Sequence, residues 1–265
     1  FVLLGLIIIF IFSFLEIKIL YKISIYFFFL TLILLILVPI IGIEVKGSKR
    51  WIDLLFLPRI QPIEFFKPFY IIMLALIISN KNLPYLLGKF IFSLLLTLFV
   101  ISLLVIQPDL GQTLLVALSW ITLIFVSGIN LIFLTTISII IIMSLLYVTF
   151  YVSKFEYIKN RLMSFFNSET GTHNFQSDKA IDSITSGGFF GKGIGEGTLK
   201  NMVPEAHTDY IISVISEEFG VIAIMLILLI FLAFIYSIFK KVENETDDIA
   251  RLILIGSGTL ILLQA

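Results

Sequence analysis

Residues 24–43 read Ser-Ile-Tyr-Phe-Phe-Phe-Leu-Thr-Leu-Ile-Leu-Leu-Ile-Leu-Val-Pro-Ile-Ile-Gly-Ile and contain no charged side chain. A helix that crosses a membrane needs about 20 consecutive apolar residues, so this stretch predicts a membrane span. The rest of the chain has a similar composition: of 265 residues, 59% are hydrophobic and 14% are charged, and the mean hydropathy is +1.12. Soluble domains carry about 25% charged residues. The sequence therefore predicts an all-α, polytopic integral membrane protein.

Seven further apolar segments extend this prediction along the chain. The first begins without Met and lacks the basic start and the cleavage site of a signal peptide, so we interpret it as the tail of a span. The final segment stops in mid-span, and we expect the chain to be truncated at both ends. The seven segments are Phe1–Phe14, Glu64–Ser79, Gly88–Ile106, Thr113–Gly128, Leu131–Val152, Tyr210–Phe239 and Ile249–Ala265.

The charged residues are few and balanced. Eighteen Lys and Arg residues match eighteen Asp and Glu residues, so net charge indicates neither a nucleic acid nor an acidic partner. The absence of cysteine excludes disulfides, Cys-ligated zinc, iron–sulfur clusters and thiol catalysis.

Eight spans place the loops alternately on two sides, and the distribution of Lys and Arg favours residues 16–23 and 240–248 as cytoplasmic. Residues 44–63, 107–112 and 153–209 are then expected on the outer side.

A group of cations follows the span at 24–43. The stretch Lys46-Gly47-Ser48-Lys49-Arg50-Trp51 places three cations within five residues. Arg offers a two-pronged donor and Lys a point charge, a combination that suits an anionic headgroup or a pyrophosphate. We therefore predict that Lys46, Lys49 and Arg50 bind such a group. The alternative is a solvated basic loop that contacts phospholipid headgroups.

Ionisable residues also lie at the starts of two later helices. Glu64 and Lys67 follow Pro62 and share one helix face at the i, i+3 spacing. Charged groups at membrane depth are costly and are candidates for function, although an ion pair that only fixes helix packing is the alternative. Asp109, in Gln-Pro-Asp-Leu-Gly-Gln-Thr, opens a further helix. Alone it would be a helix-start acid favoured by the helix dipole.

The segment Pro204-Glu205-Ala206-His207-Thr208-Asp209-Tyr210 opens the span at 210–239. A carboxylate between lipid and water can have a raised pKa and act as a base, which makes Asp209 a candidate; a plain helix cap is the alternative. His207 is one of only two histidines. That count argues against a His-rich zinc site, while carboxylates and water could still hold Mg²⁺.

A glycine-rich run lies within the long polar region at 153–209. Residues 187–197 contain alternating glycines, but neither the dinucleotide-binding nor the P-loop spacing is met. We therefore reject a nucleotide fold and interpret the glycines as backbone freedom in a tight loop. The region also keeps many aromatic residues, unlike disordered segments. We expect it to be ordered and to pack against the membrane surface.

Taken in order, these segments resemble the SEDS family of cell-wall polymerases, typified by FtsW and RodA, and Ala206 before His-Thr-Asp is more similar to the FtsW-type branch. The resemblance covers essentially the whole chain. The matching segments are Lys46–Ile52, Gln61–Lys67, Gln107–Thr113, Ser186–Gly193, Pro204–Tyr210 and Glu217–Gly220.

The resemblance implies a single ten-helix transmembrane domain, of which residues 1–265 would lack the first and last helices, with 153–209 as a large extracytoplasmic loop in a bacterial cytoplasmic membrane. It implies polymerisation of lipid II into glycan strands during cell division, beside a class B penicillin-binding transpeptidase and other divisome proteins. Asp209 would be the base on the acceptor sugar hydroxyl. The resemblance leaves open whether a divalent cation, Mg²⁺ or Mn²⁺, is a cofactor. The remaining implied substrate-binding residues are Lys46, Lys49, Arg50, Glu64, Lys67, Asp109 and His207.

Two other functions remain open from the sequence. A lipid II flippase would also use buried charges such as Glu64 and Lys67, although we find none of the internal symmetry of many transporters. A non-catalytic scaffold for a transpeptidase would tolerate the loss of Asp209.

Overall fold

The computed structural model describes residues 2–45, 48–54, 57–80, 86–153, 156, 159, 175–198 and 211–264. The chain divides into two compact units. Unit 1 comprises residues 1–145 and 238–265, and unit 2 comprises residues 146–237.

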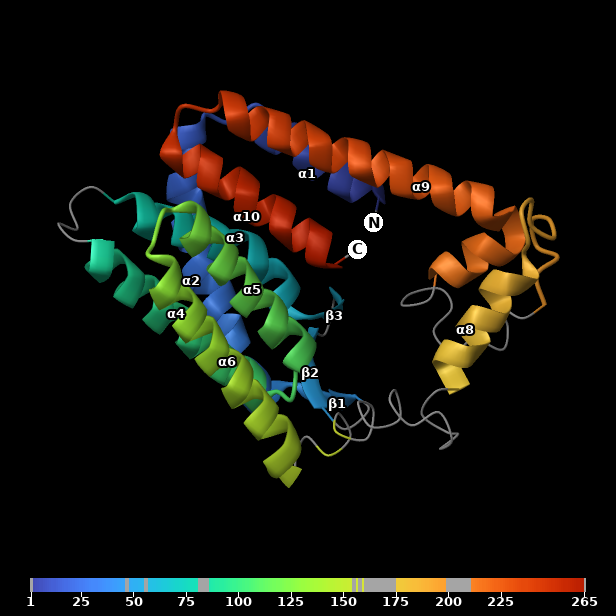
Figure 1. The fold of residues 1–265 in the computed structure, drawn as a ribbon, viewed down its shortest axis with the longest axis horizontal. Helices are drawn as coiled ribbons and strands as arrows, with labels where there is room; N and C mark the ends of the chain where they lie inside the picture. Colours follow the sequence, from blue (N-terminus) through green and yellow to red (C-terminus); the bar gives the residue numbers. More distant parts are fainter. Residues whose placement is uncertain are drawn as a thin grey trace. The chain divides into compact units, whose positions relative to one another are not determined.

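Helices account for most of the described chain, which confirms the all-α, polytopic prediction (Figure 1). Within the described residues, five helices are long and apolar enough to cross a membrane, namely α2, α3, α4, α6 and α9. The shorter α1, α5 and α10 correspond to the other predicted apolar segments. The helices along the chain are α1 (Val2–Ser13), α2 (Ile17–Ile41), α3 (Pro62–Ser79), α4 (Leu86–Ile106), α5 (Leu110–Val126), α6 (Leu131–Tyr151), α8 (Phe175–Ser186), α9 (Ile211–Asn244) and α10 (Asp248–Gln264).

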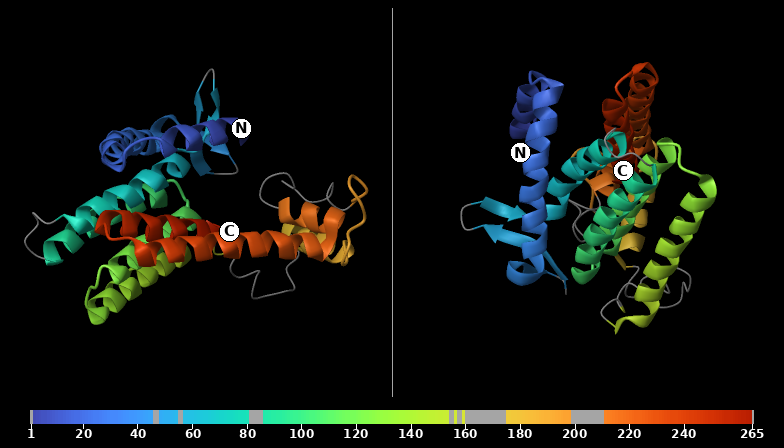
Figure 2. Two further views of the ribbon diagram at one scale, coloured as in Figure 1. Left: turned by 90° about the horizontal axis from the view of Figure 1, so that it is seen from above. Right: turned by 90° about the vertical axis from the view of Figure 1, so that its left-hand side faces the viewer.

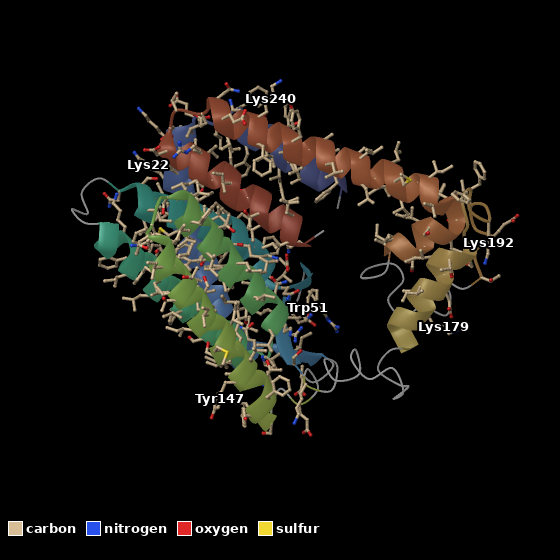
Figure 3. All side chains as sticks on the ribbon, viewed as in Figure 1. Lys22, Trp51, Tyr147, Lys179, Lys192 and Lys240 are labelled. Atoms are coloured by element: carbon tan, nitrogen blue, oxygen red, sulfur yellow. The ribbon has the colours of Figure 1, made fainter. Side chains whose placement is uncertain are left out.

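Helix α2 begins earlier than the apolar pattern indicates. The predicted span starts at Ser24, whereas the helix starts at Ile17, because a helix can continue beyond the apolar segment that crosses the membrane. The Tyr21 hydroxyl donates a 3.2 Å hydrogen bond to Asp247 Oδ2. This contact places the start of α2 beside the α9–α10 turn, near Lys22 and Lys240 in Figure 3. These two segments were predicted to lie on the same side of the membrane.

A small antiparallel sheet lies between α2 and α3 and was not predicted from the sequence. Its order is β1 (Ile43–Val45), β2 (Ser48–Leu54), β3 (Leu57–Ile60), and Figure 2 shows the strands at one end of α2. The pairing of β1 with β2 shifts at Arg50, since Ile43 pairs with Trp51 and Glu44 pairs with Lys49. Ile52 is buried and β2 packs on α2 and α3. The side chain of Arg50 is directed toward the start of α5, where it pairs with Asp109.

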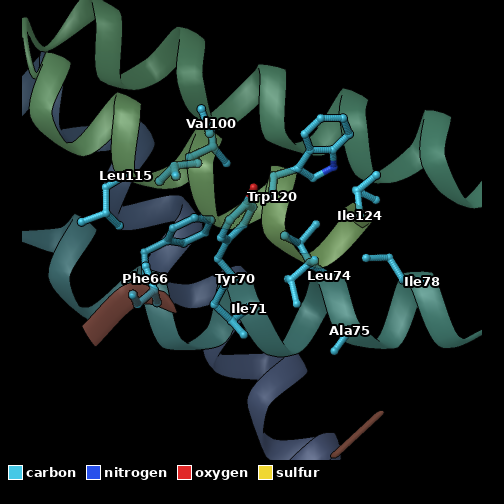
Figure 4. Packing of buried hydrophobic residues seen from close by; sticks show 14 of the residues in the cluster. Phe66, Tyr70, Ile71, Leu74, Ala75, Ile78, Val100, Leu115, Trp120 and Ile124 are labelled. Atoms are coloured by element: carbon cyan, nitrogen blue, oxygen red, sulfur yellow. The ribbon is translucent and has the colours of Figure 1, made fainter. Parts of the chain in front are cut away.

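Helix α3 is the centre of the core of unit 1 (Figure 4). It packs against α2, α4, α5 and α10, and Tyr70 is fully buried. Two buried hydrogen bonds reinforce the apolar contacts: Tyr70 shares one of 2.7 Å with Thr97 Oγ1, and Trp120 Nε1 donates one of 3.1 Å to Ser93 Oγ. Buried polar groups are costly unless they are paired. These bonds therefore fix the relative positions of α3, α4 and α5.

In unit 2, α8 and a loop at residues 187–198 pack on the first turns of α9. Gly220 interrupts α9 with a φ angle of 77°, so the helix bends there. The predicted order of the 153–209 region is observed for α8 and this loop. The rest of that region lies largely outside the described residues.

Candidate functional site

Arg50 and Asp109 form the first contact of the candidate site. Arg50 Nε lies 3.6 Å from Asp109 Oδ2, and the side chains are 27% and 7% exposed, respectively. The Arg50 guanidinium also donates a hydrogen bond to the carbonyl oxygen of Pro108. The contact joins β2 to the start of α5. It places the 44–63 and 107–112 segments on one side, as the alternation of spans predicts.

Glu64, Lys67 and Gln112 form the second contact, a closed triangle of side chains. Lys67 Nζ lies 2.7 Å from Glu64 Oε2 and donates a 3.1 Å hydrogen bond to Gln112 Oε1. Gln112 Nε2 completes the triangle with a 2.8 Å hydrogen bond to Glu64 Oε1. From α10, Gln264 Nε2 approaches Glu64 Oε2 at 3.5 Å. The predicted i, i+3 pair is therefore an ion pair that also joins α3 to α5.

The helix cap of α5 connects these two contacts. Asp109 Oδ1 accepts a 3.4 Å hydrogen bond from the backbone N–H of Gln112, which confirms the predicted helix-start role of Asp109. Its pairing to Arg50 was not predicted from the sequence. Burial raises the pKa of Asp109, while the neighbouring Arg50 charge acts to lower it. Because α3 and α5 both start here, the partial positive charges of two helix ends add to the two cations.

Each ion pair has one buried and one more accessible partner. Lys67 is 3% exposed beside Glu64 at 43%, and Asp109 is 7% exposed beside Arg50 at 27%. The surface of the site thus offers a guanidinium and a carboxylate, each held in place by a buried opposite charge. Such an arrangement can bind an anionic group at one position and accept hydrogen bonds from hydroxyl or amide groups at the other.

The structure brings four of the predicted site residues together: Arg50, Glu64, Lys67 and Asp109. Lys49 is an exposed residue of β2 and pairs in register with Glu44. The remaining predicted residues, Lys46, His207 and Asp209, lie outside the described residues. In the described part of the chain, no three His, Cys, Asp or Glu side chains are grouped so that they could hold a metal ion.

Gln112 is a site residue that sequence reasoning missed. An amide at helix position three after a capping Asp looks like an ordinary surface residue. The available signal was its place in the Gln-Pro-Asp-Leu-Gly-Gln-Thr segment, three residues after Asp109. Its contacts to both members of the ion pair appear only when α3 and α5 are packed together.

The chain was compared with known protein families and with curated proteins. The family model FTSW_RODA_SPOVE, described as "Cell cycle protein", matches residues 1–265. A relative from Trichlorobacter lovleyi, named "Probable peptidoglycan glycosyltransferase FtsW", is 32% identical over 86% of this chain and 60% of its own length. A relative from Caulobacter vibrioides with the same name is 31% identical over 70% of this chain and 46% of its own length. The chain thus spans about half to three-fifths of these relatives.

Two solved structures share the fold. A structure titled "Structural coordination of polymerization and crosslinking by a peptidoglycan synthase complex" gives a TM-score of 0.75 over 97% of this chain and 72% of its own, at 24% identity. The crystal structure of the Thermus thermophilus rod shape determining protein RodA gives a TM-score of 0.65 over 97% of this chain and 68% of its own, also at 24% identity. With its apolar helices, this likeness identifies a multi-pass membrane protein.

Proposed function

The chain belongs to the FtsW/RodA/SpoVE family of cell cycle proteins, and from this premise we propose that the protein carrying it is a peptidoglycan glycosyltransferase that polymerises lipid II into glycan strands during cell division. The names of the Trichlorobacter and Caulobacter relatives support this activity and the FtsW branch. The structural observation that carries the proposal is the linked cluster of Arg50, Asp109, Glu64, Lys67 and Gln112 at the starts of two apolar helices.

In the proposed reaction, Asp209 accepts the proton from the acceptor sugar's 4-hydroxyl as that oxygen attacks the donor's anomeric carbon. The new glycosidic C–O bond forms while the bond from the anomeric carbon to the pyrophosphate oxygen breaks. The leaving group is undecaprenyl pyrophosphate, and the anomeric configuration inverts. Negative charge develops on the pyrophosphate, so fixed cations lower the barrier.

We assign the charge-stabilising role to Arg50, with Lys46 and Lys49 beside it in sequence. The side chain of Arg50 is partly accessible, and its contact with Asp109 and the Pro108 carbonyl fixes the guanidinium. Preorganised donors of this kind need no rearrangement as charge develops. Asp109 and Lys67, which are buried, then act through Arg50 and Glu64 as positioning residues, and Glu64 and His207 are proposed to contact the sugar or peptide part of the substrate.

A divalent cation such as Mg²⁺ or Mn²⁺ would add Lewis-acid stabilisation of the pyrophosphate when bound. In the described residues the two carboxylates of the cluster, Glu64 and Asp109, already pair with Lys67 and Arg50. Those residues therefore do not fit a metal site. In the proposed reaction, the cationic side chains of the protein stabilise the developing negative charge.

We further propose a bacterial cytoplasmic membrane location, with the cluster on the outer face, and a crosslinking partner of the class B penicillin-binding type. The partner is supported by the structurally similar chain, whose title describes a complex coordinating polymerisation with crosslinking.

The proposal is tested with the full-length protein reconstituted with its transpeptidase. Purified lipid II is supplied, and glycan chains are resolved on a gel. Chains longer than the disaccharide support the polymerase. If no chains form while labelled lipid II crosses the bilayer of vesicles containing the protein, the flippase alternative replaces it.

A further inference from the structure

Glu217 is a fully buried acid in unit 2 that the proposed reaction does not use. Its Oε1 lies 3.0 Å from Lys192 Nζ and accepts a 2.9 Å hydrogen bond from the backbone N–H of Thr198. Its Oε2 accepts a 3.2 Å hydrogen bond from Ser183 Oγ. One carboxylate on α9 therefore holds α8 through Ser183 and the glycine-rich loop at residues 187–198 through Lys192 and Thr198.

Backbone hydrogen bonds reinforce the same junction. In an unbroken helix, the Glu217 carbonyl would accept from the N–H of Val221. Because α9 bends at Gly220, the Glu217 carbonyl instead accepts a 2.9 Å hydrogen bond from Lys192, and the Val221 N–H donates one of 3.0 Å to the Gly188 carbonyl. The loop thus supplies the partners that the bend removes from the helix.

The glycines of the loop permit this close packing. A Cβ atom on Gly191 would lie 2.1 Å from the Glu218 carbonyl oxygen, and one on Gly197 would lie 2.8 Å from Glu217 Oε2. On the helix side, a Cβ on Gly220 would lie 2.3 Å from the Phe189 carbonyl oxygen. The glycine run is therefore explained by its contact with α9, in agreement with the rejection of a nucleotide fold.

The junction has a consequence for the segment that contains Asp209. Residues 199–210 begin directly after Thr198, whose N–H is bound by Glu217. They end at Ile211, the first residue of α9, the helix that carries Glu217. Fixing both ends of a connecting segment reduces the number of conformations open to it. Glu217 therefore ties Thr198 to the helix that begins at Ile211, and these are the two described residues that flank the segment carrying the proposed base.

We propose that Glu217 is a positioning residue for the transferase, which fixes the start of the Asp209 segment against α9 through Thr198 and Lys192. The proposal rests on the proposed function of Asp209. Its effect on the loop is separate, because amide exchange reports on the loop whether or not the protein turns over lipid II.

The test compares Glu217→Gln with Glu196→Gln, an exposed acid of the same loop, in the full-length protein in lipid nanodiscs. Hydrogen exchange of the peptides covering 187–210 is followed by mass spectrometry. We expect exchange there to rise about tenfold in Glu217→Gln, since a hydrogen bond to a charged group is lost, and to be unchanged in Glu196→Gln. With purified lipid II, we expect kcat to fall about tenfold while KM changes less than about twofold.

A second variant covers the case in which Glu217→Gln does not fold. Gly197→Ala retains every charge, and the three atoms nearest to the added Cβ all belong to the Glu217 side chain, so we expect the same local rise in exchange. Unchanged exchange at 187–210, or an equal rise throughout α8 and α9 in both variants, overturns the proposal. A wild-type protein that forms no glycan chains refutes the proposed function, whereas the exchange data still decide whether Glu217 holds the loop.

Discussion

Lys67 Nζ lies 2.7 Å from Glu64 Oε2, one helical turn earlier on α3, and only 3% of the lysine side chain is exposed against 43% of the glutamate side chain. The pair is therefore asymmetric. Removing the glutamate leaves a buried cation, whereas removing the lysine leaves a carboxylate that water can reach. The cost of a broken pair depends mainly on the charge that stays buried.

Glu64→Ala is therefore expected to destabilise the protein more than Lys67→Met does. We expect a loss of about 1.5–3 kcal/mol for Glu64→Ala, because Lys67 retains only Gln112 as a partner among the contacts described above, and less than about 1 kcal/mol for Lys67→Met. Thermal unfolding in detergent measures both, with Lys18→Met, at an exposed site on α2, as the control. Equal losses in the two variants would show that the burial asymmetry has no energetic effect.

Arg50→Lys should lower activity, although it keeps the charge. Arg50–Asp109 and Arg59–Asp53 are both 3.6 Å pairs, but the side chains of the second are 62% and 52% exposed. Lysine cannot reproduce the fork geometry of a guanidinium. We expect initial rates of lipid II polymerisation to fall about tenfold in Arg50→Lys, and less than about twofold in the matched control Arg59→Lys. Similar rates in both variants would show that the Arg50 guanidinium has no specific role in the reaction.

The buried Asp109 carboxyl predicts a pH dependence of stability. Burial raises its pKa in the folded protein, and Arg50 lowers it in part. A raised pKa means that the folded state binds this proton more readily than the unfolded state does. The stability contributed by this group is thus present below the unfolded pKa and is lost as pH rises through the folded pKa.

Asp109→Asn removes this titration. As the pH rises above about 4, the ordinary pKa of an Asp side chain, the Tm of the wild type is expected to decline more than that of the variant, measured in the same detergent. Parallel curves would mean that Asp109 does not titrate differently in the folded and unfolded states.

Gly191→Ala and Gly195→Ala separate packing from backbone strain. The two glycines have nearly equal φ angles of 79° and 83°, so an alanine is strained at both. A Cβ on Gly191 would lie 2.1 Å from the Glu218 carbonyl oxygen, whereas nothing lies within 4 Å of one on Gly195. We expect limited proteolysis of the loop to accelerate about tenfold more in Gly191→Ala, since a steric collision adds to a strain cost of about 1 kcal/mol. Equal cleavage rates would leave strain as the only effect.

The helices could be predicted from the sequence because each apolar run, such as Ser24–Ile43, is a local property. The sheet could not, because its strands are short and mix charged with apolar residues, as in Ser48–Leu54. Its strand pairing depends on the packing of β2 on α2 and α3. The extension of α2 to Ile17 was missed because polarity marks where the membrane ends and not where a helix ends.

For the site, the residue types of Arg50, Glu64, Lys67 and Asp109 could be identified from the sequence, and so could the i, i+3 pair. The contact between Arg50 and Asp109 joins residues far apart in the chain and follows only from the packed structure. Gln112 was missed for the same reason, because an uncharged amide gains significance from the two charges that it bridges.

The most direct test of the account is the polymerisation of purified lipid II by the full-length protein carrying Asp209→Asn, reconstituted with its transpeptidase. Asp182→Asn, at an exposed acid on α8, is the matched control. The account predicts glycan chains from the wild type and from Asp182→Asn, and none from Asp209→Asn at equal membrane insertion. Chains of normal length from Asp209→Asn would contradict the assignment of Asp209 as the base.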